Sequence, residues 1–148
     1  MVTTVGTEST FDKMVQNLLI LEHDAMSAYQ ATIDRLEDPA SREKIAAFKQ
    51  DHEAHARELR RMASSLGIEA PMEGDAKELL TKGKVVLAGL VGDRTVLKAM
   101  ATNEIETKMA YDQASRNDAA PAEARAYFQK AFADEDRHKQ WMDAAAAT

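Results

Sequence analysis

Apolar residues recur every three or four positions along most of the chain, which is the spacing of amphipathic helices. The first such segment is expected to begin at Ser9, which with Asp12 resembles a capping box, and to end at Glu37 or Asp38. Its apolar stripe consists of Phe11, Val15, Leu18, Ala25, Tyr29, Ile33 and Leu36. Stripes of the same spacing occur in three later segments, so the pattern predicts four long helices.

The second helix has sequence signals at both ends. Asp38 is a good N-cap residue, and Pro39 fits a first helical turn although it cannot continue the helix before it. The apolar stripe then runs to about Leu66, and Gly67 can adopt the left-handed conformation that ends many helices. Because the connection around Pro39 is so short, the first two helices should be antiparallel neighbours.

Residues 68–92 break the helical pattern with a proline and several glycines. Within this link, Asp75 would cap a short helix over 77–90. Asp93 is expected to cap the third long helix, and a polar stretch separates that helix from a fourth, which opens at Pro121. Two helical hairpins joined by a long crossover predict an all-α, antiparallel four-helix bundle.

The composition fits one helical domain. With 148 residues the chain is long enough for one sizeable core, so we expect a flexible arm over 1–10 and a single domain over 11–148. The lack of cysteine excludes disulfides, zinc–thiolate sites and thiol catalysis. A net charge of -6 disfavours nucleic acid and anionic membranes as partners, and no apolar run has the length of a membrane span. Without a signal-peptide pattern, the expected compartment is the cytoplasm.

Carboxylates and imidazoles interrupt the apolar stripes near the middle of all four helices. Positions seven apart lie within about 20° of each other around a helix, so Glu22 shares a line with Val15 and Tyr29. The other polar residues on stripe positions are His52 and His55 in the second helix, Glu104 in the third, and Glu135 and His138 in the fourth. Since a buried charge normally pairs with an opposite charge or binds a metal, these six residues are the candidate metal ligands.

The two halves of the chain repeat this arrangement. The matching features are Glu22–Tyr29 with Glu104–Tyr111, Asp51 with Asp134, and His52–His55 with Glu135–His138. The separation from Glu22 to His55 is 33 residues, and that from Glu104 to His138 is 34. Such a repeat is typical of a duplicated helical hairpin, and it places the candidate ligands at equivalent depths in the two hairpins.

Other polar residues near the stripes receive less specific interpretations. Tyr29 and Tyr111 should pack in the core, where each could hydrogen-bond into the site. His23 is one position off the stripe and is expected at its boundary or on the surface, while Asp24 and Glu106 should face solvent. The six candidates themselves also fit a second reading, in which ion pairs fix the helix register without any metal.

The layout resembles the ferritin-like superfamily. A Glu on each of two helices and a Glu-x-x-His motif on each of the others is the ligand set of its di-iron and di-manganese members. The segments LEHDAMSAYQATIDRLEDPASREKIAAF, DHEAHARELRRM and VVLAGLVGDRTVLKAMATNE are similar to small bacterial ferritin-like proteins, some of them associated with stress responses. The resemblance implies a two-metal site of iron or manganese and suggests a family, not an activity. Carboxylates with imidazoles would support redox handling of iron, oxygen or peroxide, so the protein, if it is an enzyme, would be an oxidoreductase. A homodimer is expected by analogy with other bundles of this size.

The first of the two motifs departs from that ligand set. It reads His52, Glu53, Ala54, His55, so a histidine stands where the family pattern has a glutamate. A neutral imidazole cannot bridge two cations as a carboxylate does, and Asp51 and Glu53 lie off the stripe. The site would then hold one metal, hold an unequal pair or be lost. The alternative function is a non-enzymatic helical stress or interaction protein with a degenerate or metal-free site.

Overall fold

Four long helices make up most of the computed structural model, which describes residues 3–72, 87 and 89–148. Their bounds are α1 (Phe11–Arg35), α2 (Pro39–Leu66), α4 (Asp93–Ser115) and α5 (Ala122–Ala147). No strand occurs among the described residues, so the prediction of an all-α fold is confirmed. None of the helices in this part of the chain is both long and apolar enough to cross a membrane.

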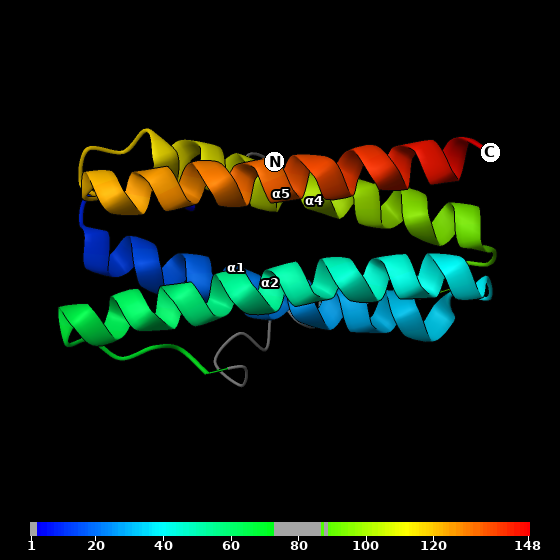
Figure 1. Cartoon of the computed structure of the whole chain (residues 1–148), viewed down its shortest axis with the longest axis horizontal. Coiled ribbons are helices and arrows are strands. Elements are labelled where there is room, and N and C mark those ends of the chain that lie inside the picture. The colour runs from blue at the N-terminus through cyan, green and yellow to red at the C-terminus, as the bar shows by residue number, and fades with distance from the viewer. Residues whose placement is uncertain (1–2, 73–86, 88) are drawn as a thin grey trace.

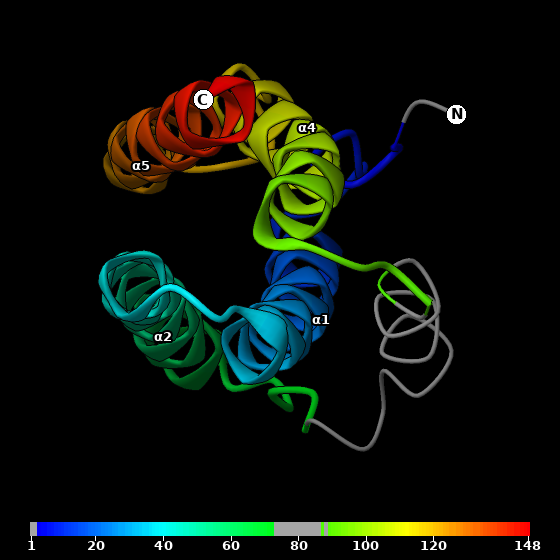
Figure 2. The same cartoon turned by 90° about the vertical axis from the view of Figure 1, so that its right-hand side faces the viewer.

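The helices pack as two hairpins that lie along the long dimension of the molecule (Figure 1). α1 packs against α2, α4 packs against α5, and the hairpins meet mainly through α1 and α4, as the end-on view in Figure 2 shows. The start of α4 lies at the turn between α1 and α2, where the Asp93 carboxylate accepts hydrogen bonds from the backbone N–H groups of Glu37 and Asp38 at 2.9 and 3.0 Å. Each helix is therefore antiparallel to the helices it packs against, as predicted.

The turn between α1 and α2 follows the local rules that the sequence suggests. Asp38 is the N-cap of α2 and accepts a hydrogen bond from a first-turn backbone N–H at 2.9 Å, with Pro39 as the first helical residue. Gly67 ends α2 in the left-handed conformation with a φ of 68°. The first helix is slightly shorter than predicted, because it ends at Arg35 and not at Glu37 or Asp38.

Two predicted helix caps are wrong. Thr10, not Ser9, is the N-cap of α1, since its hydroxyl accepts the first-turn hydrogen bond. The N-cap of α4 is Gly92, which has no side chain to cap the helix, and Asp93 is the first helical residue. Its carboxylate holds the α1–α2 turn, a partner distant in sequence that capping rules do not consider. The short helix predicted over 77–90 lies mostly outside the described residues.

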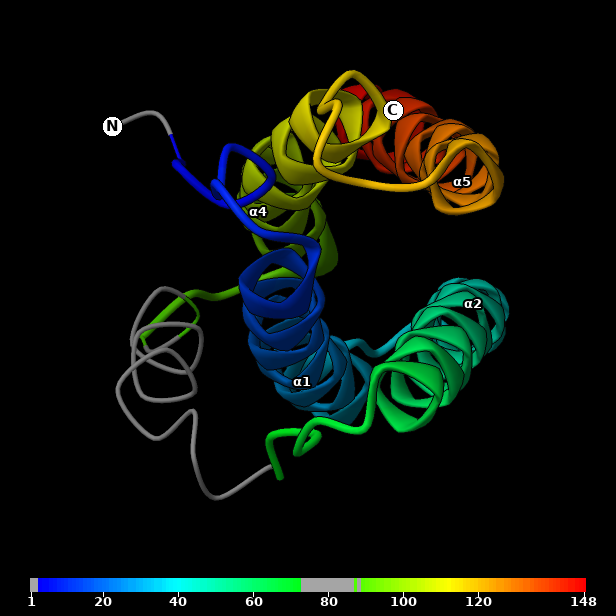
Figure 3. The same ribbon diagram turned by 90° about the vertical axis from the view of Figure 1, so that its left-hand side faces the viewer.

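The segment before α1 lies against α4 (Figure 3). The side-chain amide of Asn117 donates hydrogen bonds to the carbonyl oxygens of Gly6 and Glu8 at 2.9 Å each, and Gln113 donates to that of Val5 at 2.8 Å. These contacts give the segment a defined path over α4. Its expected flexibility, like the division into a short arm and one domain, stays a prediction.

Gly6 is the closest point of this segment to α4, and we expect Gly6→Ala to be strongly destabilising. Its φ is +96°, and an added Cβ would lie 2.7 Å from the backbone nitrogen of Ala114 and still closer to the carbonyl oxygen of Ala110. Such strain should lower the free energy of unfolding by about 1–3 kcal/mol. Gly67→Ala is the matched control, because Gly67 also has a positive φ but no atom within 4 Å of the added Cβ. Urea unfolding should rank Gly6→Ala as the more damaging; equal losses would contradict this close packing.

Two apolar clusters fill the two ends of the bundle. The cluster near the start of α1 includes Met14, Leu18, Leu59, Tyr111 and Phe128. The cluster at the other end includes Tyr29, Ile45, Phe48, Leu97, Met100 and Met142, with Leu87 of the connecting segment also buried there. Along every helix, the residues between these clusters include polar ones. The apolar ends therefore enclose a polar layer at mid-height, sealed from water along the bundle axis.

Candidate metal centre

The six ligand candidates occupy this polar layer and all are buried. The exposed fraction of the residue is 2% for Glu104 and 0% for the other five. Glu22 lies on α1, His52 and His55 on α2, Glu104 on α4, and Glu135 and His138 on α5. The seven-residue spacing within the stripes thus directs one or two polar side chains from each helix into the same layer.

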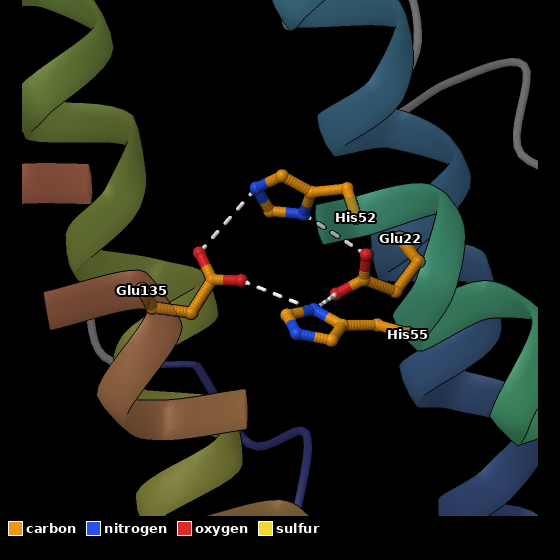
Figure 4. A group of neighbouring side chains, drawn as sticks. All are labelled: Glu22, His52, His55 and Glu135. Atoms are coloured by element: carbon orange, nitrogen blue, oxygen red, sulfur yellow. Dashed lines mark hydrogen bonds and ion pairs between the residues drawn. The ribbon is translucent and has the colours of Figure 1, made fainter. Parts of the chain in front are cut away.

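Two overlapping groups of four residues have the geometry of a metal site. One is made by Glu22, His52, His55 and Glu135 (Figure 4), the other by His52, Glu104, Glu135 and His138. In each group, one ligand atom from every residue lies within 4.8 Å of the others. His52 and Glu135 belong to both groups. The structure therefore brings all six sequence candidates together, in two groups that share their central residues.

Each histidine of the cluster has one ring nitrogen against a carboxylate oxygen. The pairs are His52 Nδ1 with Glu22 at 2.9 Å, His55 Nε2 with Asp134 at 2.8 Å, and His138 Nε2 with Asp51 at 2.8 Å. The opposite ring nitrogens face the other carboxylates of the layer. His52 Nε2 lies 3.4 Å from Glu104 and 3.5 Å from Glu135, and His55 Nδ1 lies 3.5 Å from Glu135.

Several of these inward-facing atoms are buried without a hydrogen bond. Within the described part of the chain, no hydrogen-bond partner exists for His52 Nε2, His55 Nδ1, Glu104 Oε2 or either carboxylate oxygen of Glu135. A buried polar atom without a partner is costly, and native proteins rarely leave several in one place. Five such atoms in a single layer fit a site in which they would serve as metal ligands.

Two tyrosines each donate a hydrogen bond to a glutamate of the other hairpin. Tyr29 on α1 donates a hydrogen bond to Glu104 on α4, and Tyr111 on α4 donates one to Glu22 on α1 at 2.9 Å. Both tyrosines are completely buried, as the sequence predicts. Each hydroxyl fixes one oxygen of a glutamate, so the tyrosines restrict the directions in which the two carboxylates can bind.

Two aspartates that were not among the six sequence candidates support the site. Asp51 on α2 reaches His138 on α5, and Asp134 on α5 reaches His55 on α2. Arg137 donates to both aspartates, at 2.7 and 3.2 Å, and so ties them together at the edge of the layer. The carboxylate–histidine pairs are of the kind that orients histidine ligands of metals. The available signal was that an aspartate precedes the ligand pair in both halves of the chain.

The remaining polar residues near the stripes have peripheral positions. His23 is 6% exposed and lies at the boundary with the connecting segment, its Nε2 3.1 Å from the carbonyl oxygen of Pro71, so a surface position is wrong for it. Asp24 is half-buried and not fully solvated, whereas Glu106 is exposed as expected. Glu53 lies 3.9 Å from Lys49 on the outer side of α2 and does not replace the missing glutamate.

Comparison with known families identifies most of the chain. A family model described as a domain of unknown function, DUF2383, matches residues 11–117. The chain belongs to this family. No curated protein and no solved structure matches the chain. The matched region contains four of the six buried candidates, and Glu135 and His138 lie beyond it.

The carboxyl groups of this family member's polar layer have strongly displaced pKa values. Burial alone would raise the pKa of Glu22, but the charge and hydrogen bond of His52 outweigh it and lower the pKa to about 2. Burial would also raise the pKa of Glu104, but contacts with Glu135 and His52 outweigh burial and lower that pKa to about 2. For Glu135, burial followed by the charge of Glu104 raises the pKa well above its usual value. Glu22 and Glu104 are therefore ionised at neutral pH, whereas the surroundings of Glu135 favour its protonated form.

The pKa values of the three histidines are shifted as well, two of them upwards and one downwards. Burial would lower the pKa of His55, but its contacts with Asp134, Glu135 and Glu22 raise it to about 11. His52 is likewise raised well above its usual pKa against the effect of burial, by the surrounding carboxylates. Burial lowers the pKa of His138. Without metal, the protonated forms of His52 and His55 are thus favoured beside the ionised Glu22 and Glu104, and a bound cation would take the place of those protons.

These pKa values predict how the stability of the metal-free protein depends on pH. The raised pKa of His55 contributes stability that is complete below 6.5 and is lost as the pH rises towards 11. The lowered pKa values of Glu22 and Glu104 contribute stability that is complete above 4.5 and is lost as the pH falls towards 2. Between those limits, the raised pKa of Glu135 makes stability fall as the pH rises, and the lowered pKa of His138 makes it increase.

We therefore expect the thermal midpoint of the metal-free protein to be highest between about pH 4.5 and 6.5 and to fall on either side. Differential scanning calorimetry in the presence of a chelator measures this directly. In His55→Gln the fall above pH 6.5 should be shallower than in the wild type. Parallel alkaline slopes for the two proteins would mean that His55 is not charged in the folded state.

Proposed function

We propose that the chain is a ferritin-like metal-binding protein that holds iron or manganese in the polar layer and uses it to handle iron, oxygen or peroxide. The observation that carries this proposal is the group of five buried ligand atoms without hydrogen-bond partners among the described residues. A well-satisfied ion-pair network would leave no such group, because each orphaned atom keeps its desolvation cost.

The donor set favours particular metals. It contains carboxylate oxygens and imidazole nitrogens, and the chain has no cysteine to offer a soft thiolate. Mixed carboxylate and imidazole ligands suit iron and manganese, and four-helix bundles with glutamates on two helices and a Glu-x-x-His spacing on others hold such metals. The up-down-down-up order of the helices and the duplicated hairpins support the ferritin-like assignment.

Bound iron or manganese would supply one-electron redox chemistry that the side chains lack. The residues of the chain would prepare the site for it. Glu104, Glu135 and His138 point donor atoms into the layer, and Tyr29 holds Glu104 in place. The apolar clusters on either side keep bulk water away, which strengthens the electrostatic interactions inside. A cytoplasmic location, a stress-related role and a homodimer stay predictions.

One observation favours the second candidate function, a metal-free helical stress or interaction protein. In the absence of metal, His52 pairs with Glu22 at 2.9 Å and His55 with Asp134 at 2.8 Å, so protons alone can balance part of the buried charge. Such a network would fix the register of the four helices without any chemistry. Among the described residues it gives neither oxygen of Glu135 a hydrogen bond, the nearest imidazole nitrogens lying 3.5 Å away, which is why we prefer the metal site.

Elemental analysis distinguishes the two functions. Protein purified from cells supplied with iron or manganese, and again after anaerobic reconstitution, should contain at least about one metal ion per chain. The double variant His55→Gln/His138→Gln should contain almost none, while Glu106→Gln, which changes an exposed glutamate on α4, should match the wild type. Only trace metal in reconstituted wild-type protein would leave the metal-free function as the better account. Oxygen consumption with ferrous iron then tests for turnover.

A further inference from the structure

The three buried histidines are oriented in a common way. Each has one nitrogen within hydrogen-bond distance of a carboxylate: His52 of Glu22, His55 of Asp134 and His138 of Asp51. A carboxylate only accepts hydrogen bonds, so that nitrogen must carry the N–H. The lone pair available for a metal is then on the opposite nitrogen, which is Nε2 of His52 and Nδ1 of the other two. In this respect Glu22 plays the same part for His52 as the two aspartates play for their histidines.

The glutamates differ in how many oxygens they have free. Both oxygens of Glu22 are engaged, one by the Tyr111 hydroxyl and the other by His52 Nδ1. Glu104 has one oxygen engaged by Tyr29 and one without a hydrogen-bond partner in the described residues. Both oxygens of Glu135 are without a partner there. The donor atoms that remain free are therefore distributed unequally between the two groups of ligands.

We infer that this centre binds one metal ion tightly, through His52, Glu104, Glu135 and His138, and that Glu22 positions His52 without binding that ion. This inference rests on the metal-binding function proposed above and assigns its stoichiometry and ligands. His52 contributes Nε2, which lies 3.4 Å from Glu104 and 3.5 Å from Glu135. His138 contributes Nδ1, which lies 3.9 Å from both glutamates and 3.5 Å from the hydroxyl of Tyr29, whose proton is directed to Glu104. Two imidazoles and two carboxylates complete a four-ligand set.

The second group of ligands is incomplete by comparison. Of its atoms in the described structure, only His55 Nδ1 and one oxygen of Glu135 have no hydrogen bond, and they lie 3.5 Å apart. His52 faces this side with an N–H, which repels a cation, and each Glu22 oxygen already accepts one hydrogen bond, so only its second lone pair would be left for a metal. A glutamate at position 52, as in the other hairpin, would supply a bridging oxygen in place of that N–H. His52 is thus the residue that makes the two groups of ligands unequal.

Anaerobic titration with Mn²⁺, followed by electron paramagnetic resonance, tests the stoichiometry. Wild-type protein should bind one Mn²⁺ per chain tightly and give the six-line spectrum of an isolated ion. His52→Glu should bind two per chain and give the broadened spectrum of a coupled pair. Two tightly bound and coupled ions in the wild type, or only one in a folded His52→Glu, would overturn the inference while leaving the metal-binding function intact. No binding by the wild type would instead remove the proposed function itself.

A second pair of variants keeps the inference testable even where His52→Glu fails to fold. Glu22→Gln and Glu104→Gln make the same chemical change on α1 and α4. Glu22→Gln should still bind one Mn²⁺ with about 10–100-fold lower affinity, as expected for loss of a group that orients a ligand. Glu104→Gln should lose more than that, because it removes a ligand. The unfolding midpoints of the metal-free variants, measured alongside, separate these effects from a general loss of stability. Equal affinity losses, or a larger loss in Glu22→Gln, would contradict the assignment.

Discussion

Glu135→Gln is expected to abolish tight metal binding while the metal-free protein stays folded. Glu135 is completely buried, belongs to both groups of ligands, and has two oxygens without hydrogen-bond partners in the described residues. An amide is a poor metal ligand, and the side chain sits at the centre of the layer. We expect the affinity to fall by more than the roughly 10–100-fold that loss of a ligand-orienting residue costs.

The metal-free Glu135→Gln protein should be close to the wild type in stability for a specific reason. Burial and the charge of Glu104 raise the pKa of Glu135 well above its usual value and so favour its neutral form without metal. Glutamine has nearly the same shape and is also neutral. Isothermal titration with Mn²⁺ or anaerobic Fe²⁺ measures the affinity, and calorimetry measures the stability. Glu106→Gln, on the exposed face of α4, should change neither. Retained affinity in Glu135→Gln would exclude it as a ligand.

Asp51→Asn is expected to weaken metal binding by about 10–100-fold and Asp134→Asn by less, although neither aspartate is among the proposed ligands. Each aspartate accepts a hydrogen bond from a histidine of the opposite hairpin at 2.8 Å and thereby fixes which ring nitrogen faces the layer. An asparagine can donate instead of accept, so the histidine would no longer be held in the binding tautomer.

The two aspartate variants should not be equally damaging, since they serve different ligands. Asp51 supports His138, which belongs to the four-ligand group, whereas Asp134 supports His55 on the weaker side. We therefore expect the larger loss in Asp51→Asn. Asp136→Asn is the control, because Asp136 is on the same helix as Asp134 but faces Lys108 at 2.7 Å. Mn²⁺ affinities that are identical for all three variants and the wild type would refute this supporting role.

The helical periodicity was sufficient to predict the fold and the buried polar residues. Glu22 and Glu104 could be identified because each lies seven residues before a tyrosine on an apolar stripe, and a stripe position determines burial in a bundle. The strong local signals at Asp38, Pro39 and Gly67 also gave the α1–α2 turn and the end of α2. These features depend only on residues that are close in sequence.

Features that depend on contacts between the hairpins could not be derived in the same way. Asp51 and Asp134 are off the stripes of their own helices, yet their side chains reach histidines on the opposite hairpin. Asp93 looks like a helix cap, but its carboxylate binds the backbone of a turn that is far away in sequence. The role of His52 depends on which of its nitrogens faces Glu22, and no sequence pattern encodes the orientation of a ring.

The most direct test of a buried metal centre is anomalous X-ray scattering from crystals of the protein reconstituted with Mn²⁺ or Fe²⁺. Data collected on both sides of the absorption edge of the metal locate the ion independently of the protein atoms. We expect one strong anomalous peak per chain in the polar layer, within coordination distance of His52 Nε2, Glu104, Glu135 and His138. A layer without anomalous density, in crystals whose metal content is established, would show that these buried side chains form an ion-pair network and not a metal site.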